Sequence, residues 1–280
     1  MKFDLLKLSM ILVIILPLAV ACNFSSDTKE KDAYDSDSLV EAEAYDVQKL
    51  KDQIVQTIVS APKTSEIVTL INTAGASFIL DITVPVEKAE KSITTTKQSL
   101  CVGMYSFDIQ YAKVYNRVDE VIKITELVNQ LITKLGLTKE LSSFEDNLAR
   151  IKQHADNKDS VDYLVTQNMN YVENQFASSD HPDIYALSFI GANIEALYVI
   201  SQLTILATDN TEILKILSNQ KERVNSIFVL LKLLSGNESV KPYYESMIPL
   251  AEFFEEHPAI GEEELNTVTP MIEKIRNSML

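Results

Sequence analysis

The sequence predicts an all-α protein: an antiparallel multi-helix bundle of about nine or ten helices behind an N-terminal lipoprotein signal peptide. Apolar residues recur every three or four positions from Val47 to the end of the chain, which is the period of an amphipathic helix. The 280 residues include only six glycines and eight prolines, whereas a β-sandwich or barrel needs turn residues about every 8–12 positions. The predicted connections are short, and short connections make successive helices antiparallel neighbours.

Residues 1–21 have the composition of a bacterial lipoprotein signal peptide. A start with two lysines leads into the apolar run 10–16, and the small residues 19–21 stand directly before Cys22. The run is too short to span a membrane, which takes about 20 apolar residues. We therefore expect cleavage before Cys22 and lipidation of its thiol, so that acyl chains hold the exported chain to a membrane. The alternative is an ordinary secretory signal in which Cys22 is incidental.

The expected mature chain, residues 22–280, is strongly acidic. Removing two lysines and one aspartate with the signal leaves 23 basic and 39 acidic side chains, a net charge of −16. This excess argues against a nucleic acid partner, because Lys and Arg are needed to neutralise phosphates. It also argues against a polybasic contact with anionic lipid. If Cys22 is acylated, Cys101 has no disulfide partner, and we expect a small core residue there, with a reactive thiol as the alternative.

The chain divides into three parts. Residues 1–21 are the predicted signal peptide, residues 22–46 a lipid-anchored, acidic and flexible tether, and residues 47–280 a single helical-bundle domain. The tether is polar and almost free of large aliphatic residues, so it cannot bury enough surface to order itself. No linker after residue 46 marks off a second domain.

The first half of the domain contains five predicted helices. The first starts at Val47 and ends before Pro62, because the residue before a proline disfavours the helical conformation. The fourth is the most regular, and Gly136 follows it as a C-terminal cap would. In order, the helices are residues 47–61, 64–80, 87–100, 100–135 and 140–155.

Five further helices complete the prediction. Pro182 stands in the first turn of one of them, a favoured place for proline, and Thr211 is a good N-cap for the next, which Gly236 closes. Pro249 and Pro270 fall inside the last two helices and are expected to kink or shorten them. These helices are residues 160–176, 183–208, 212–235, 241–256 and 262–279.

The sequence lacks the motifs of common catalytic and cofactor sites. It has no glycine-rich phosphate loop and no HExxH, ExxH, CxxC or GxSxG motif. His154, His181 and His257 stand near predicted helix ends, and none has a second histidine or a carboxylate at ligand spacing on an apolar face. We therefore predict no catalytic residue, no metal ligand and no cofactor.

Asp108 is the residue of greatest chemical interest. Its neighbours at three, four and seven positions are apolar or aromatic and include Tyr105, Tyr111 and Tyr115, which predicts that its carboxyl group points into the core. A buried carboxylate is costly unless it is paired or hydrogen-bonded. One hypothesis is a structural network with a tyrosine hydroxyl or a basic side chain as partner. The other is a polar group with a raised pKa in a ligand cavity. The solvent-facing side of the helix is predicted to be Ser99, Ser106, Gln110, Lys113 and Arg117.

Glu195 is the only charged residue between Asp183 and Asp209. A membrane span of this length would carry a central glutamate at a cost of about 2.5–3.5 kcal/mol, so a central helix inside the bundle is the preferred interpretation. Gly191 and Tyr198 share the face of Glu195, and a small residue there lets another helix or a ligand approach closely. Glu195 and Tyr198 are therefore candidates for a ligand site or a buried polar network with Asp108.

Two short blocks carry a resemblance to known proteins. Residues 103–116 (GMYSFDIQYAKVYN) form a G-x-Y-x-x-D-x-x-Y-x-x-x-Y block, and residues 191–198 (GANIEALY) form a G-x-x-x-E-x-x-Y block. Over residues 100–200 the chain resembles all-helical bacterial lipoproteins of unknown function. The resemblance implies a lipid-anchored helical bundle and no known activity.

These features predict a lipoprotein anchored to the bacterial cell envelope, at the outer membrane, that acts as a non-enzymatic binding or interaction module. Its partners would be the membrane, through the N-terminal lipid, and a protein or small molecule that the sequence does not name. A second hypothesis is a ligand cavity around Asp108 and Glu195. A third is an enzyme that uses the two carboxyl groups as acid and base, which would place them about 5–10 Å apart across an open cleft. A packed core that satisfies both groups internally would favour the first.

Overall fold

The computed structural model describes residues 36–137 and 143–280, with side chains for residues 47–137 and 146–280. The predicted signal peptide, Cys22 and most of the predicted tether lie outside these residues. Every regular element in the described part of the chain is helical, which confirms the all-α prediction.

The described residues form twelve α-helices and one 3-10 helix. Ten of the α-helices have ten residues or more, in agreement with the expected nine or ten, and the other two are shorter. The elements are α1 (Ser36–Ser60), α2 (Thr64–Thr73), η1 (Leu80–Ile82), α3 (Glu87–Lys91), α4 (Thr95–Val114), α5 (Val118–Lys134), α6 (Ser143–Gln153), α7 (Lys158–Ser178), α8 (Pro182–Leu206), α9 (Thr211–Ser218), α10 (Lys221–Leu234), α11 (Lys241–Glu256) and α12 (Glu262–Met279).

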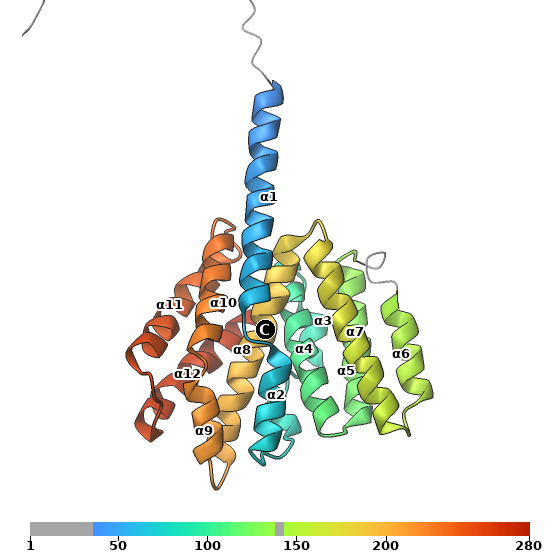
Figure 1. Cartoon of the computed structure of the whole chain (residues 1–280), viewed down its shortest axis with the longest axis vertical. Coiled ribbons are helices and arrows are strands. Elements are labelled where there is room, and N and C mark those ends of the chain that lie inside the picture. Colours follow the sequence, from blue (N-terminus) through green and yellow to red (C-terminus); the bar gives the residue numbers. More distant parts are fainter. Residues whose placement is uncertain (1–35, 138–142) are drawn as a thin grey trace, which may run out of the picture. The chain divides into compact units, whose positions relative to one another are not determined.

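Contacts divide the chain after Glu43, and the unit Ala44–Leu280 contains the whole described core. Within this unit α4 and α8 lie at the centre and make the most extensive helix–helix contact (Figure 1). Helices α5 to α7 follow on the side of α4, and α9 to α12 pack on the side of α8. The core is thus built around one crossing of two long helices.

Helix α8 is the central helix of the bundle. It is the one helix in the described residues that is long and apolar enough to cross a membrane, with a mean hydropathy of 1.5. However, 83% of that apolar window is buried inside the domain, where α4, α10 and α12 cover it. The helix therefore has the place that the sequence predicted for it, and Pro182 stands at its start as expected.

Two glycines allow α4 and α8 to cross with their backbones in contact. A Cβ atom on Gly103 would overlap the carbonyl oxygen of Ser188, and a Cβ atom on Gly191 would overlap the carbonyl oxygen of Leu100. The Ser188 hydroxyl also donates a 3.1 Å hydrogen bond to the carbonyl of Ser99 across the same crossing. The glycines that open the two sequence blocks are therefore required by helix packing.

Four predicted helices are divided or shortened in the structure. The predicted helix 87–100 divides into α3, which ends at Lys91, and the start of α4 at Thr95. Helix α2 ends at Thr73, because Gly75 adopts a left-handed conformation (φ 79°) and starts an irregular segment. The predicted helix 100–135 breaks between α4 and α5, where Asn116 is left-handed (φ 58°). The predicted helix 212–235 divides into α9 and α10.

Other boundaries also differ from the prediction. Helix α1 begins at Ser36 and not at Val47, so the last residues of the predicted tether are helical. Pro249 and Pro270 do not shorten α11 and α12, which both continue through the proline. Ser99, predicted to face solvent, is fully buried because α8 covers that side of α4.

Candidate functional site

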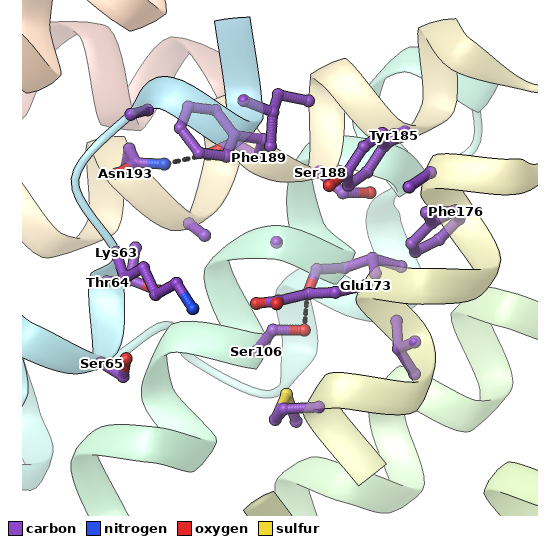
Figure 2. A pocket seen from close by; sticks show the side chains of 18 of the residues that line it. Lys63, Thr64, Ser65, Ser106, Glu173, Phe176, Tyr185, Ser188, Phe189 and Asn193 are labelled. Carbon is purple, nitrogen blue, oxygen red and sulfur yellow. Dashed lines mark hydrogen bonds between the residues drawn. The ribbon is translucent and has the colours of Figure 1, made fainter. Parts of the chain in front are cut away.

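The crossing of α4 and α8 has a pocket on one side, with a volume of about 310 Å³ (Figure 2). The end of α1, the start of α2 and helices α4, α7 and α8 form its walls. This volume lies at the lower end of the roughly 300–1,000 Å³ typical of small-molecule sites. The pocket residues of α4 include Ser106 and Gln110, which the sequence had placed on the solvent side of that helix.

The lining of the pocket is largely apolar. Its lining includes Val102 and Ser188, both buried at the helix crossing, and the aromatic rings of Phe176, Tyr185 and Phe189. Phe176 and Tyr185 stack with ring centroids 5.9 Å apart and hold one wall in place. The surface offered to a ligand there is therefore largely hydrocarbon.

Two opposite charges stand at the pocket entrance. Glu173 projects from α7 and Lys63 precedes α2, and both are exposed. Figure 2 shows their charged ends directed into the same space from opposite sides. Within the described residues neither side chain has an ion-pair or hydrogen-bond partner. Although Glu173 reaches solvent, the surrounding pocket walls partly desolvate its carboxyl group and raise its pKa, and the charge of Lys63 offsets this only in part.

A buried cation lies behind the Lys63 side of the pocket. Asn193, which lines the pocket, donates from Nδ2 to the carbonyl of Phe189 at 2.7 Å and accepts from Arg223 at Oδ1. Arg223 is 2% exposed and also donates to Gln220 (2.8 Å) and to the Lys63 carbonyl (3.2 Å). Because burial disfavours the charged form, the pKa of Arg223 is lowered to about 10. The guanidinium therefore stays charged at neutral pH and adds positive potential at that end.

A different face of α4 holds the irregular segment of residues 74–94 onto the core. The backbone of this segment lacks helical partners over much of its length and needs hydrogen bonds from elsewhere. The hydroxyl groups of Tyr105, Tyr111 and Tyr115 donate to the carbonyls of Pro85 (2.8 Å), Ser77 (3.2 Å) and Ala76 (2.7 Å). The first two hydroxyls also accept from the N–H groups of Ala89 (3.2 Å) and Ile79 (3.1 Å).

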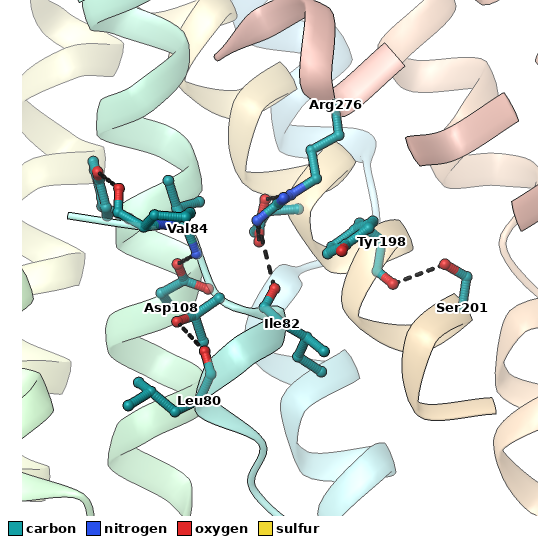
Figure 3. Close-up of polar contacts among 11 residues, drawn as sticks. Leu80, Ile82, Val84, Asp108, Tyr198, Ser201 and Arg276 are labelled. Atoms are coloured by element: carbon teal, nitrogen blue, oxygen red, sulfur yellow. Dashed lines mark hydrogen bonds and ion pairs between the residues drawn. The ribbon is translucent and has the colours of Figure 1, made fainter. Parts of the chain in front are cut away.

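Asp108 belongs to the same row of side chains. It is fully buried, and its Oδ2 accepts a 2.9 Å hydrogen bond from the N–H of Val84 (Figure 3). Its Oδ1 has no hydrogen-bond partner within the described residues. Burial raises the pKa of Asp108 well above its usual value, and the nearby charge of Glu195 raises it further. The N–H of Val84 and the charge of Arg276 act in the opposite direction but do not outweigh burial, so the pKa stays raised.

Glu195 forms a buried, bidentate ion pair with Arg276 of α12. The Nε and Nη2 atoms of Arg276 lie 2.7 and 2.8 Å from the two carboxylate oxygens. The guanidinium carbon lies 3.9 Å from the ring centroid of Tyr198, a cation–π contact, and Nη2 reaches the Ile82 carbonyl at 3.5 Å (Figure 3). Burial raises the pKa of Glu195, and the neighbouring charge of Arg276 lowers it only in part. For Arg276, burial lowers the pKa, but the pairing with Glu195 outweighs this, so the pKa is raised.

The structure therefore brings the candidate residues of α4 and α8 into one buried region around residues 74–94. The predicted partner of Asp108, a tyrosine hydroxyl or a basic side chain, was wrong: the partner is a backbone amide, because the tyrosines bind neighbouring parts of the same segment. None of the candidates lines the pocket beside the α4–α8 crossing, nor a second hollow next to Arg150 and His154. These candidates are Tyr105, Asp108, Tyr111, Tyr115, Glu195 and Tyr198.

Arg276 is the ion-pair partner of Glu195, and the sequence analysis missed it. It stands on the apolar stripe of the last helix, four residues after Ile272 and three before Met279, both buried. An arginine on such a stripe needs a buried acidic partner, and Glu195 is the only charge in α8 beyond its first turn. These two signals together could have predicted the pair.

The other candidates are structural. Cys101 is buried with its Sγ 3.1 Å from the Ser92 hydroxyl, and burial raises the pKa of its thiol, which fits a small core residue and not a reactive one. In the described part of the chain, no three His, Cys, Asp or Glu side chains are grouped closely enough to hold a metal ion.

Comparisons with known proteins give no guide to the site. No protein family, curated protein or solved structure matches this chain.

Proposed function

We propose that this chain is a lipid-anchored protein of the bacterial outer membrane whose helical domain binds a small molecule and does not transform it. The pocket between α2, α4, α7 and α8 is the proposed binding site, and this pocket is the single observation that carries the proposal. It combines an apolar interior with a few polar groups at its entrance, as small-molecule sites do. The resemblance to all-helical lipoproteins of unknown function is consistent with this proposal.

The placement of the buried carboxyl groups supports binding over catalysis. Glu195 uses both oxygens on Arg276, and Asp108 is bound to the backbone of residues 74–94. A general acid or base must reach the proton that it transfers. Neither group lines the pocket between α2, α4, α7 and α8.

Anchorage rests on the sequence of residues 1–22 and is tested by Cys22→Ser. We expect the wild-type chain to fractionate with membranes and to incorporate labelled fatty acid. The Cys22→Ser chain should stay in the soluble exported fraction after a salt wash, because it lacks the acyl chains. A variant that still sediments with membranes would mean that the anchor is not the lipid.

Binding is tested by thermal unfolding of the full chain with a panel of zwitterionic, anionic, cationic and neutral metabolites. A ligand at 100 times its Kd stabilises by about 2.7 kcal/mol, which for a domain of this size raises the Tm by roughly 5–10 °C. Ser106→Phe is the matched variant, because the Ser106 side chain lines the pocket and bonds only to the Val102 carbonyl of its own helix. We expect one class to stabilise the wild type and not Ser106→Phe. If no class stabilises the wild type, the pocket is not a binding site.

A further inference from the structure

The charges around the pocket restrict what it can hold. Glu173 and Lys63 face the same space and make no ion pair with each other, since no such contact falls within 4.0 Å. A simple anion would be drawn to Lys63 but repelled by Glu173, and a simple cation would meet the reverse. A ligand with both charges would satisfy both residues at once.

The depth of the pocket restricts the rest of the ligand. The charged groups are exposed, whereas the pocket lining also includes the buried Val102 and Phe176 and the half-buried Phe189. A volume of about 310 Å³ lies at the lower end of the range of small-molecule sites. It suits a ligand with one apolar side chain and a small polar head group.

We propose that the pocket binds a free α-amino acid with an apolar side chain, its ammonium group at Glu173, its carboxylate at Lys63 and its side chain among the aromatic residues of α7 and α8. This inference rests on the proposed function, since it names the ligand class of the same pocket. Arg223 supports it, because a buried guanidinium behind Asn193 adds to the attraction for the carboxylate. Partial desolvation raises the pKa of Glu173, and the ammonium group of the ligand would act against this effect.

The test is equilibrium dialysis of labelled L-phenylalanine against the full-length chain in non-ionic detergent. Two analogues remove one charge each: L-phenylalaninamide lacks the carboxylate, and N-acetyl-L-phenylalanine lacks the ammonium group. Glycine removes the apolar side chain. We expect L-phenylalanine to bind at least tenfold more tightly than each of the three, because each loses a charge-assisted hydrogen bond or the apolar contact.

Variants of the protein provide the second arm. Glu173→Gln and Lys63→Met should each weaken the binding of L-phenylalanine at least tenfold. Both side chains are exposed and have no partner within the described residues, so these variants should fold. Glu256→Gln and Lys232→Met, exposed positions outside the pocket lining, are the matched controls and should leave the Kd unchanged.

The outcomes separate this inference from the proposed function. The inference fails if L-phenylalanine does not bind saturably, if either one-charge analogue binds as tightly, or if Glu173→Gln and Lys63→Met bind like the wild type. If another class of metabolite stabilises the wild type and not Ser106→Phe, the amino acid is wrong and the binding site stands. If nothing in the panel binds, both are wrong.

Discussion

The stability of the Asp108→Asn variant relative to the wild type should increase as the pH rises, because the wild type loses stability and the variant does not. In the folded protein Asp108 is buried beside the charge of Glu195, and its pKa is raised well above the usual value. In the unfolded chain its pKa returns to about 3.9. Between these two pKa values the folded state holds a proton that the unfolded state has lost, so the wild-type stability falls as the pH rises.

The size of the effect follows from this proton. One proton held only in the folded state lowers the free energy of unfolding by about 1.4 kcal/mol per pH unit. The Asp108→Asn side chain keeps an oxygen that can accept from the Val84 N–H and has no proton to lose. Its amide nitrogen has no partner in place of Oδ1, which costs about 1–3 kcal/mol at every pH. The stability difference between variant and wild type should therefore change by up to about 1.4 kcal/mol per pH unit as the pH rises above about 3.9, whatever that fixed cost is.

The assay is urea unfolding of both proteins at a series of pH values. Asp81→Asn is the control, because Asp81 lies in η1 on the same segment but is exposed. Its stability curve should run parallel to that of the wild type. If the Asp108→Asn curve is also parallel, Asp108 is ionised in the folded protein and the argument from burial is refuted.

Three further predictions concern the packing around this network. Glu195→Ala should destabilise the domain by about 3–5 kcal/mol in chemical denaturation, because it leaves Arg276 buried without its partner; the pair Glu195→Leu with Arg276→Met should lose much less, and an equal loss would show that the ion pair is not the cause. Gly103→Ala should lower the Tm sharply or prevent folding, since its Cβ would overlap the Ser188 carbonyl, whereas Gly236→Ala, with nothing within 4 Å of the new Cβ, should keep the Tm within a few degrees. Tyr115→Phe should cost about 1 kcal/mol and speed amide hydrogen exchange in residues 74–94, because one hydrogen bond to the Ala76 carbonyl is lost; the exposed Tyr163→Phe is its control, and equal exchange in the two variants would contradict the holding role of α4.

Much of the fold could be predicted from the sequence because its signals are local. The period of apolar residues predicts the helices, and the uncharged run of α8 predicts a central helix. The apolar neighbours of Asp108 predict that it is buried, and the structure gives it no exposed surface. Each of these properties is determined by residues within two helical turns.

The features of the fold and of the site that the sequence did not predict depend on contacts between residues far apart in the chain. Nothing near Asp108 in the sequence shows that its partner is the Val84 backbone, because that contact depends on how residues 74–94 return along α4. The pocket was missed for the same reason. The pattern around Ser106 and Gln110 predicts a solvent-exposed face, but in the folded domain these residues line a pocket together with residues of α7 and α8. Lys63 and Glu173 are 110 positions apart in the sequence, and only folding brings them to the same pocket.

The central claim is that the pocket, and not the buried network of the two sequence blocks, is the binding site. The most direct test is the Kd for L-phenylalanine of Asp108→Asn and Ser106→Phe, measured side by side with the wild type. We expect a Kd for Asp108→Asn within twofold of the wild type and a loss of binding in Ser106→Phe. Loss of binding in Asp108→Asn, with Ser106→Phe unchanged and both variants folded, would contradict it and place the site at the network.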